Sequence, residues 1–276
     1  MKVLGLDFTS APSKRKPITC VESSLKGCTL VAERLRTLNS LEEFETFLQH
    51  DGPWIAGIDL PFGQPRRLID NIGWPANSWE EYVGFLSQRS AEEFDQILKG
   101  YKKDRPKGDK QHLRRTDELA GSKSPMMMYG VPVGKMFFRG APLLAKSLAC
   151  IIPCRPTDSD RLVVEAYPGI VARKWSDGSY KGESPSKDTT ARKMQREGIL
   201  SKILSSSLTE LYGLELHMEG ISAETLISDP KGDRLDSLLC TIQAAWAYSA
   251  KQDGFGIPAD ADPLEGWIVD PSTQGA

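Results

Sequence analysis

The chain has 276 residues, of which 39% are hydrophobic and 26% charged, and this composition excludes intrinsic disorder and fibrous repeats. A chain of this length buries about three quarters of its unfolded surface, so it needs neither disulfides nor a metal to fold. Its net charge of −2 excludes a uniformly basic coat for nucleic acid.

The first residues of the chain and the spacing of its cysteines indicate the cellular compartment in which the protein is expected. The first seven residues lack a secretory pattern, and the longest apolar stretch, 141–152, is interrupted by Lys146 and Ser147 and is too short to cross a bilayer. Five irregularly spaced cysteines are not a disulfide framework. We therefore expect a cytoplasmic protein with no membrane partner, and the sequence leaves its oligomeric state open.

The first sixty residues contain four apolar runs separated by turn signals. These runs predict strands over residues 2–8, 18–23, 28–35 and 54–60. Ser40 and Glu43 form a capping-box pattern that predicts a helix before the fourth strand. The predicted element order is therefore β-β-β-α-β.

The rest of the chain is predicted to be mainly helical. Residues 64–150 have a looser pattern and are interpreted as an insertion carrying a basic loop, within a single domain of residues 1–276. We expect the residues after Asp270 to be frayed. The expected elements are a strand over 161–167 and helices over 79–85, 91–99, 143–152, 187–212 (with breaks at Gly198 and 205–207) and 233–250.

Two aspartates end predicted strands in the same way. Asp7 and Asp59 each lie two residues after a glycine, Gly5 or Gly57, so the glycine and the carboxylate share one face of the strand. A carboxylate is costly to bury without a partner, and a divalent cation would supply one. The alternative is that each aspartate only opens a turn.

Three further acids join this pattern. Asp233 and Asp236 are three residues apart at the start of the last helix, so they share one helix face. Helix capping and the positive end of the helix explain them equally well. Glu165 lies inside an apolar strand and requires a counter-charge or an exposed edge.

Acids on the first strand, the fourth strand and a late helix resemble the RNase H-like nuclease superfamily, and the start of the last helix resembles its resolvase branch. The strings GLDFTS, IDLPFG, VEAYP and DRLDSLLC together resemble, more closely, a family of unassigned function predicted to be RNase H-fold nucleases. This resemblance implies an α/β, three-layer RNase H-like fold with a mixed five-stranded sheet and a large, mostly helical or loop insertion.

The resemblance also implies a reaction, the metal-dependent hydrolysis of phosphodiester bonds in nucleic acid or nucleotides. Two Mg²⁺ or Mn²⁺ ions would activate water and stabilise the leaving oxygen. Asp7 would bridge the ions, Asp59 would bind one, and Asp236, assisted by Asp233 or Glu165, would bind the other. The catalytic residues would then be Asp7, Asp59 and Asp236. Asp59 departs from the pattern, because many superfamily members carry Glu there.

A basic segment provides candidate substrate contacts. Residues 99–115 carry eight Lys or Arg and two Asp, a local charge of +6, which leaves −8 for the rest of the chain. Such a segment binds phosphates or forms a solvated loop. The Met-rich run that follows, 126–128, is interpreted as packing of the insertion or as a lid. The stretch from Arg115 and Asp117 to Ser124 resembles an R-x-D…S-P pattern of the same predicted family, and this resemblance implies that these three residues contact substrate. The predicted substrate-binding residues are Arg114, Arg115, Asp117, Ser124 and Lys135.

Two other functions remain open. The string GLDFTS also resembles the first phosphate loop of actin-like ATPases and sugar kinases, although no second β-β-β-α-β unit is visible. The other alternative is a degenerate nuclease domain that binds without catalysis.

Overall fold

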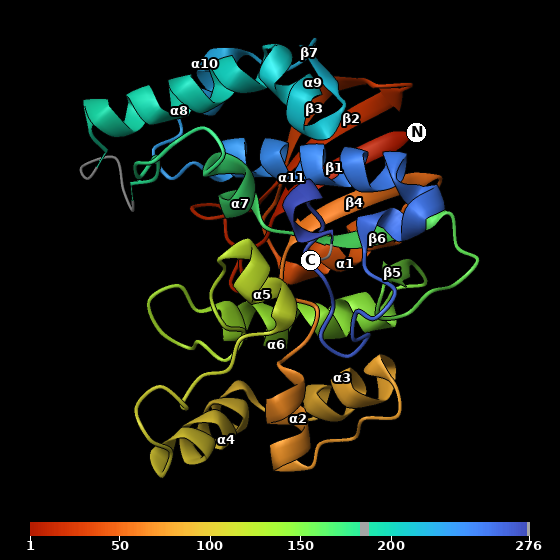
Figure 1. Ribbon diagram of the computed structural model, residues 1–276, viewed down its shortest axis with the longest axis vertical. Helices are drawn as coiled ribbons and strands as arrows, with labels where there is room; N and C mark the ends of the chain where they lie inside the picture. Colours follow the sequence, from red (N-terminus) through yellow and green to blue (C-terminus); the bar gives the residue numbers. More distant parts are fainter. Residues whose placement is uncertain (183–187, 275–276) are drawn as a thin grey trace.

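The computed structural model describes residues 1–182 and 188–274 and shows an α/β protein built on one mixed sheet of seven strands (Figure 1). The strand order is β5-β6-β4-β1-β2-β3-β7. The strands are β1 (Lys2–Asp7), β2 (Ile18–Lys26), β3 (Thr29–Leu38), β4 (Trp54–Asp59), β5 (Cys150–Ile152), β6 (Arg161–Ala166) and β7 (Glu215–Met218).

The centre of the sheet is β1, which pairs antiparallel with β2 and parallel with β4. Strand β6 pairs parallel with β4, and β5 pairs parallel with β6 at one edge. Strand β7 pairs parallel with β3 at the other edge. The expected α/β class is confirmed, and the sheet has two strands more than the five expected because short strands extend both edges.

Helices cover the sheet on both faces. In Figure 1, α11 crosses in front of β1 and β4, while α2, α3 and α4 lie below the sheet and α8, α9 and α10 lie above it. The helices are α1 (Leu41–Leu48), α2 (Arg66–Ile72), α3 (Trp79–Ser87), α4 (Ala91–Lys103), α5 (Arg115–Ala120), α6 (Val133–Lys146), α7 (Pro168–Ala172), α8 (Thr190–Ile203), α9 (Ser206–Tyr212), α10 (Ala223–Ile227) and α11 (Asp233–Ser249), with 3₁₀ turns over Lys251–Gly256 and Pro271–Thr273.

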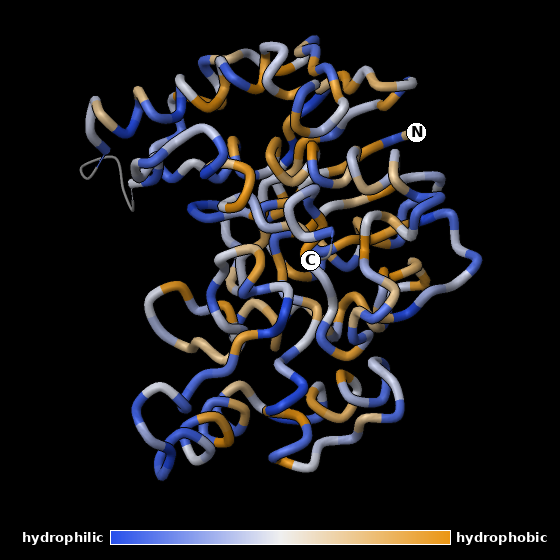
Figure 2. Tube along the Cα trace, in the orientation of Figure 1, coloured by the Kyte–Doolittle hydropathy of each residue, from blue (hydrophilic) through white to orange (hydrophobic). Residues whose placement is uncertain are grey.

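Successive side chains of a strand point to opposite faces of the sheet, so each strand contributes to two separate hydrophobic cores. Val3 of β1 packs with α8, α9 and α11 on one face, and its neighbours Leu4 and Leu6 pack with α1, α3 and α6 on the other. Figure 2 shows hydrophobic residues following the strands and the inner sides of the helices. Among the described residues, no helix is long and apolar enough to span a membrane.

The predicted helix over 143–152 is wrong. Helix α6 starts ten residues earlier, at Val133, and ends at Lys146, and residues 150–152 form the edge strand β5. The apolar run therefore belongs to two elements, separated by Ser147, whose extended backbone ends the helix. Helix α6 packs against the sheet, so the end of the predicted insertion forms part of the layer that covers it.

Two smaller expectations also differ from the structure. Helix α8 continues through Gly198 without the predicted break. The second predicted break, at 205–207, is confirmed within a residue or two, because α8 ends at Ile203 and α9 begins at Ser206 with Ser205 as its N-cap. The predicted start at Lys187 lies outside the described residues. Directly after Asp270 the chain forms the 3₁₀ turn Pro271–Thr273, because the Asp270 side chain accepts hydrogen bonds from Ser272 N (2.9 Å) and the Tyr212 hydroxyl (2.6 Å). Residues 275–276 lie outside the described residues.

Candidate functional site

The carboxylates of Asp7 and Asp59 lie side by side at one end of the sheet. Leu6 pairs with Ile58 in the parallel β1–β4 ladder, so the residues that follow them leave adjacent strands at the same edge. Both aspartates follow, by two positions, a glycine that faces α11. The predicted pairing of the two strand ends is therefore present in the fold.

The glycines of these strands allow helix α11 to lie unusually close to the sheet. A Cβ atom on Gly5 would be 2.1 Å from the carbonyl oxygen of Ser237, and one on Gly57 would be 2.5 Å from that of Cys240. The strand face beside each aspartate is thus filled by the backbone of α11. This close approach brings the first turn of α11, with Asp233 and Asp236, to the same end of the sheet as Asp7.

Helix capping does not account for the two acids of α11. The N-cap position is held by Gly232, with φ of 75°, and it makes no side-chain cap. The buried Asp236 instead accepts a hydrogen bond from the Tyr180 hydroxyl at 2.6 Å and forms an ion pair with Lys181. We call Asp7, Asp59, Asp233 and Asp236, with Lys181, the carboxylate cluster.

Burial and mutual repulsion raise the pKa of every acid in the carboxylate cluster. Desolvation, followed by the charge of Asp236, raises the pKa of Asp7 well above its usual range. Desolvation raises the pKa of Asp59 to about 7, against the attraction of Lys181. The pKa values of Asp233 and Asp236 are raised by desolvation as well. Lys181 acts on all four carboxylates and Lys231 acts on Asp233, so the acids outnumber the cations and the site favours additional positive charge.

Glu165 lies on the opposite face of the sheet. It pairs in register with Ile58, one position before Asp59, so its side chain points away from α11. There the Arg114 guanidinium binds both of its carboxylate oxygens, at 2.6 and 2.9 Å, and Phe62 N donates a third hydrogen bond at 3.0 Å. The counter-charge that Glu165 requires is therefore Arg114, and the structure does not bring Glu165 into the carboxylate cluster.

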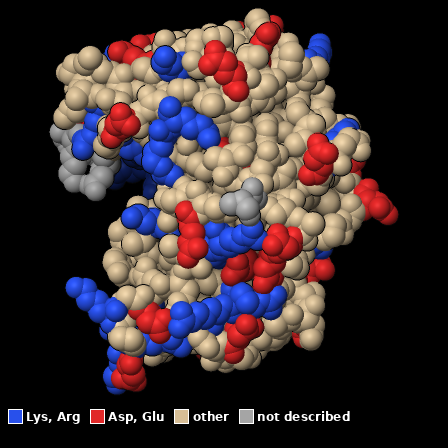
Figure 3. All heavy atoms as spheres, in the orientation of Figure 1, with Lys and Arg blue, Asp and Glu red and all other residues tan. Residues whose placement is uncertain are grey.

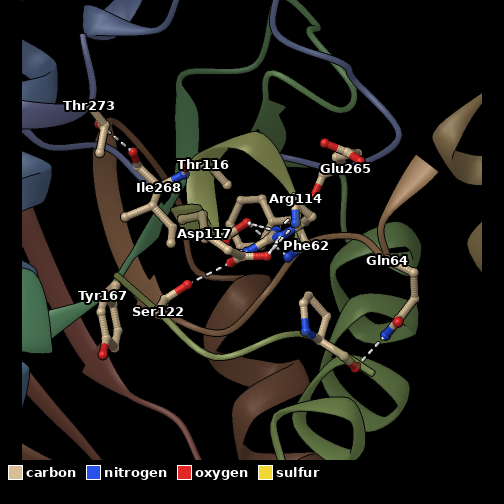
Figure 4. A network of polar contacts seen from close by, with 12 residues as sticks. Phe62, Gln64, Arg114, Thr116, Asp117, Ser122, Tyr167, Glu265, Ile268 and Thr273 are labelled. Atoms are coloured by element: carbon tan, nitrogen blue, oxygen red, sulfur yellow. Dashed lines mark hydrogen bonds and ion pairs between the residues drawn. The ribbon is translucent and has the colours of Figure 1, made fainter. Parts of the chain in front are cut away.

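Arg114 is the centre of a second buried group of charges. Its side chain also binds both oxygens of Asp117, at 2.8 and 2.9 Å, and Ser122 donates to Asp117 at 2.6 Å. Figure 4 shows Arg114 between Asp117 and the chain at Phe62, with Ser122 pointing towards Asp117. Arg114, Asp117 and Glu165, which we call the arginine cluster, are all at most 2% exposed.

The other predicted substrate contacts are dispersed. Arg115 is exposed and pairs with Asp260 at 2.7 Å. Ser124 is buried, and its hydroxyl donates to the carbonyl oxygen of His112 at 2.5 Å. Lys135 lines a separate cavity of about 890 Å³ beside Ser10.

The basic segment is partly neutralised by its own fold. Its first residues continue helix α4, where Lys99 pairs with Asp95 at 2.5 Å, and Arg105 pairs with Asp109 at 2.6 Å. Figure 3 shows Lys and Arg side chains gathered on the left and lower parts of this face, with acidic side chains between them, and the face is hollowed at its left edge.

A cavity of about 280 Å³ links the two clusters. Asp59 and Lys181 line it at the carboxylate cluster, and Arg114, Asp117 and Glu165 line it at the arginine cluster. Apolar and aromatic side chains form much of the remaining wall. They are contributed by the β6–α7 junction, the start of α6 and the segment before it: Val131, Val133, Met136, Ala166, Tyr167 and Pro168.

Sequence reasoning missed Tyr180 and Lys181, which complete the carboxylate cluster. They belong to an irregular segment 55 to 56 residues before Asp236 in the chain, and no periodicity or motif marks them. Within the described ranges, no group of three or more His, Cys, Asp or Glu side chains is arranged to hold a metal ion. In this arrangement the Lys181 ammonium provides the positive charge at Asp236.

Comparisons with known proteins complete the description of the site. A scan against protein-family models and searches of curated proteins and of solved structures gave no match. The functional assignment therefore depends on the geometry of the carboxylate cluster and the cavity beside it.

Proposed function

We propose that the protein is a metal-dependent nuclease with an RNase H-like fold. The observation that carries the proposal is the concentration of Asp7, Asp59 and Asp236 at one end of the sheet, where burial makes their combined negative charge costly. The strand order β3-β2-β1-β4-β6, with β1 central and parallel to β4, supports the RNase H-like assignment.

The carboxylate oxygens of the cluster are the donor type that Mg²⁺ or Mn²⁺ takes, although within the described residues these side chains are not arranged around a metal position and would have to move to bind one. Both are hard cations that take oxygen ligands, and the acids at this site offer carboxylate oxygens. Asp7, Asp59 and Asp236 would hold the metal, with Asp233 beside them. Lys181 forms an ion pair with Asp236, so metal binding requires its ammonium to move away.

The bound metal would supply an activated water and a positive charge for the leaving oxygen. The residues of the chain have other tasks. Tyr180 orients the Asp236 carboxylate through its hydrogen bond, and α11 holds Asp236 against β1. Lys181, released from Asp236, provides a cation for a substrate phosphate at the mouth of the cavity.

Glu165 is not part of the proposed metal site. Its two oxygens are bound by Arg114 on the opposite face of the sheet. We assign it, together with Arg114 and Asp117, to the floor of the cavity.

The test is cleavage of single-stranded DNA, RNA, branched junctions and nucleotides with 1 mM Mn²⁺. We expect the wild type to cleave at least one of them and Asp7→Asn and Asp236→Asn to abolish cleavage while remaining folded. The control is Asp51→Asn, because Asp51 is exposed just before β4, at the end opposite the cluster. Inertness of the wild type towards every substrate would overturn the proposal, and ATP turnover would favour the kinase or ATPase alternative.

Metal binding is measured separately by thermal unfolding. A ligand at one hundred times its dissociation constant stabilises the folded state by about 2.7 kcal/mol, which corresponds to a Tm increase of roughly 5–10 °C at this chain length. We expect Mn²⁺ to raise the Tm of the wild type and of Asp51→Asn. Asp7→Asn should lose this increase, and an equal increase in Asp7→Asn would exclude the proposed metal site.

A further inference from the structure

The cavity beside the carboxylate cluster has the size of a small-molecule site. Its volume of about 280 Å³ is close to the lower end of the range for ligand pockets, about 300 Å³. A double helix cannot enter a space of this size, whereas one planar ring system can. The occupant must therefore be a single unit of the substrate.

Tyr167 lines the cavity, and its ring is held by its neighbours. A Cβ atom on Gly169 would be 2.6 Å from Cζ of Tyr167, so the glycine makes room for the ring. Arg173 lies 5.3 Å from the centre of the ring and donates to its hydroxyl at 3.1 Å. The backbone N–H of Tyr167 donates to Gln243 Oε1 at 3.0 Å. These contacts hold Tyr167 as a preformed platform.

Further apolar side chains line the cavity. Val133 and Met136 come from the first turn of α6, and Val131, from the segment before it, is 59% exposed. A valine this exposed at the mouth of a cavity leaves apolar surface uncovered in the free protein. A flat apolar ligand would cover it.

The polar groups of the cavity lie at its ends. Asp59 and Lys181 connect it to the carboxylate cluster, and Ser122 and the exposed Lys123 line it beside the arginine cluster. An aromatic wall, a polar edge and a cation next to a phosphodiesterase centre match the parts of one nucleotide.

We propose that this cavity binds one unpaired nucleobase of the substrate, with Tyr167 as its stacking partner and Lys181 beside the adjoining phosphate. The inference deepens the proposed function, since it takes the substrate to be nucleic acid. It predicts that the substrates are single strands, strand ends or nucleotides, because a base inside a continuous duplex does not reach the cavity.

The test is calorimetric binding of UMP and AMP, compared with ribose 5-phosphate, in the presence of Mg²⁺. We expect both nucleotides to bind at least tenfold more tightly than the sugar phosphate. Loss of base–aromatic stacking costs about 1–3 kcal/mol, so Tyr167→Ala should weaken nucleotide binding by about 5- to 150-fold. Tyr167→Phe keeps the ring and should bind within about threefold of the wild type.

Tyr248 provides the matched control. Like Tyr167, it is a partly buried tyrosine packed against the same core, with a cation, Lys251, 4.6 Å from its ring centre that also donates to its hydroxyl. Tyr248 does not line the cavity. Tyr248→Ala should therefore leave nucleotide binding unchanged.

Met136→Trp supplies a second variant that does not alter Tyr167. The larger side chain should fill the cavity, so nucleotide binding should be lost while ribose 5-phosphate binding is retained. This variant keeps the test decisive if Tyr167→Ala does not fold.

Equal binding of UMP and ribose 5-phosphate would overturn the inference, as would unchanged nucleotide binding in both Tyr167→Ala and Met136→Trp. The two proposals can fail separately. Nucleotide binding that depends on Tyr167, without any cleavage by the wild type, would overturn the nuclease proposal and support the base site. Metal-dependent cleavage, with nucleotides bound no more tightly than ribose 5-phosphate, would support the nuclease proposal and overturn the base site.

Discussion

Two buried groups of acids lie at the same end of the sheet, and they differ in how far cations neutralise their negative charge. In the arginine cluster, one guanidinium makes two hydrogen bonds to each of two carboxylates, Asp117 and Glu165. In the carboxylate cluster, the acids share the ammonium of Lys181, which forms its ion pair with Asp236, and Lys231 acts on Asp233. The first group is closed by its own hydrogen bonds, and the second retains an excess of negative charge.

The two groups lie on opposite faces because Asp59 and Glu165 are offset by one position in the register of β4 and β6. Asp59 pairs with Ala166, and its predecessor Ile58 pairs with Glu165, so Asp59 and Glu165 point to opposite faces of adjacent strands. On one face lies α11, which brings more acids, and on the other lies Arg114. A buried acid at a strand end is therefore neutralised within the protein where its own face of the sheet holds a bidentate cation, as at Glu165, and keeps its demand for positive charge where it does not, as at Asp59.

The largest effect on stability is expected in the arginine cluster. Arg114→Met would leave Asp117 and Glu165 buried without their partner, which costs about 3–5 kcal/mol in the free energy of unfolding. Arg115→Met is the matched control. Arg115, the next residue in the chain, forms an exposed pair with Asp260, worth less than about 1 kcal/mol, and lies 5.6 Å from the centre of the Trp267 ring. Urea denaturation measures both. Equal losses in the two variants would show that the cluster is not a structural unit.

A smaller effect with the opposite sign is expected at Asp59. Burial raises its pKa to about 7 from an ordinary 3.8, so the folded state binds more protons than the unfolded state between these values. The contribution of Asp59 to the free energy of unfolding of the wild type therefore falls as the pH rises from about 4 to 7. Without metal, Asp59→Asn should be more stable than the wild type at pH 8 by roughly 1–3 kcal/mol.

The same variant tests the cause of this effect. The gain of Asp59→Asn should shrink as the pH falls from 7 to 4, because the wild-type carboxyl is then protonated in the folded protein. The exposed Asp51→Asn should show no such change. Urea midpoints in EDTA over this pH range measure the difference, and a gain that is independent of pH would contradict burial of the charge as its origin.

The smallest effect is expected at Lys181, whose side chain is 43% exposed. Lys181→Met leaves the buried Asp236 without its ammonium, so in EDTA the protein should lose about 1–2 kcal/mol. The Mn²⁺-induced increase in Tm should be larger than in the wild type, because no ammonium competes with the metal. Lys110→Met, in the exposed part of the basic segment, serves as the control. An unchanged response to Mn²⁺ would show that Lys181 does not compete with the metal.

The strands and helices with clear local signals could be predicted from the sequence. Strands β1, β2 and β4, the helix α1 with Ser40 as its N-cap, and the long helix α11 all lie within a few residues of their predicted positions. Residues 143–152 could not be divided correctly, because an apolar run of this length is equally compatible with a helix and with an edge strand. Pairing with β6 decides that residues 150–152 are extended.

The candidate site was predictable only in part, for a physical reason. The sequence determined that Asp7 and Asp59 follow buried strands two residues after a glycine, and that Asp233 and Asp236 begin a helix, because each of these patterns is local. The tertiary structure decided which groups share a site. It placed Lys181 and Tyr180 on Asp236, turned Glu165 towards Arg114, and seated α11 on the two glycines. These contacts depend on strand pairing and helix packing between residues far apart in the chain, and no local pattern encodes them.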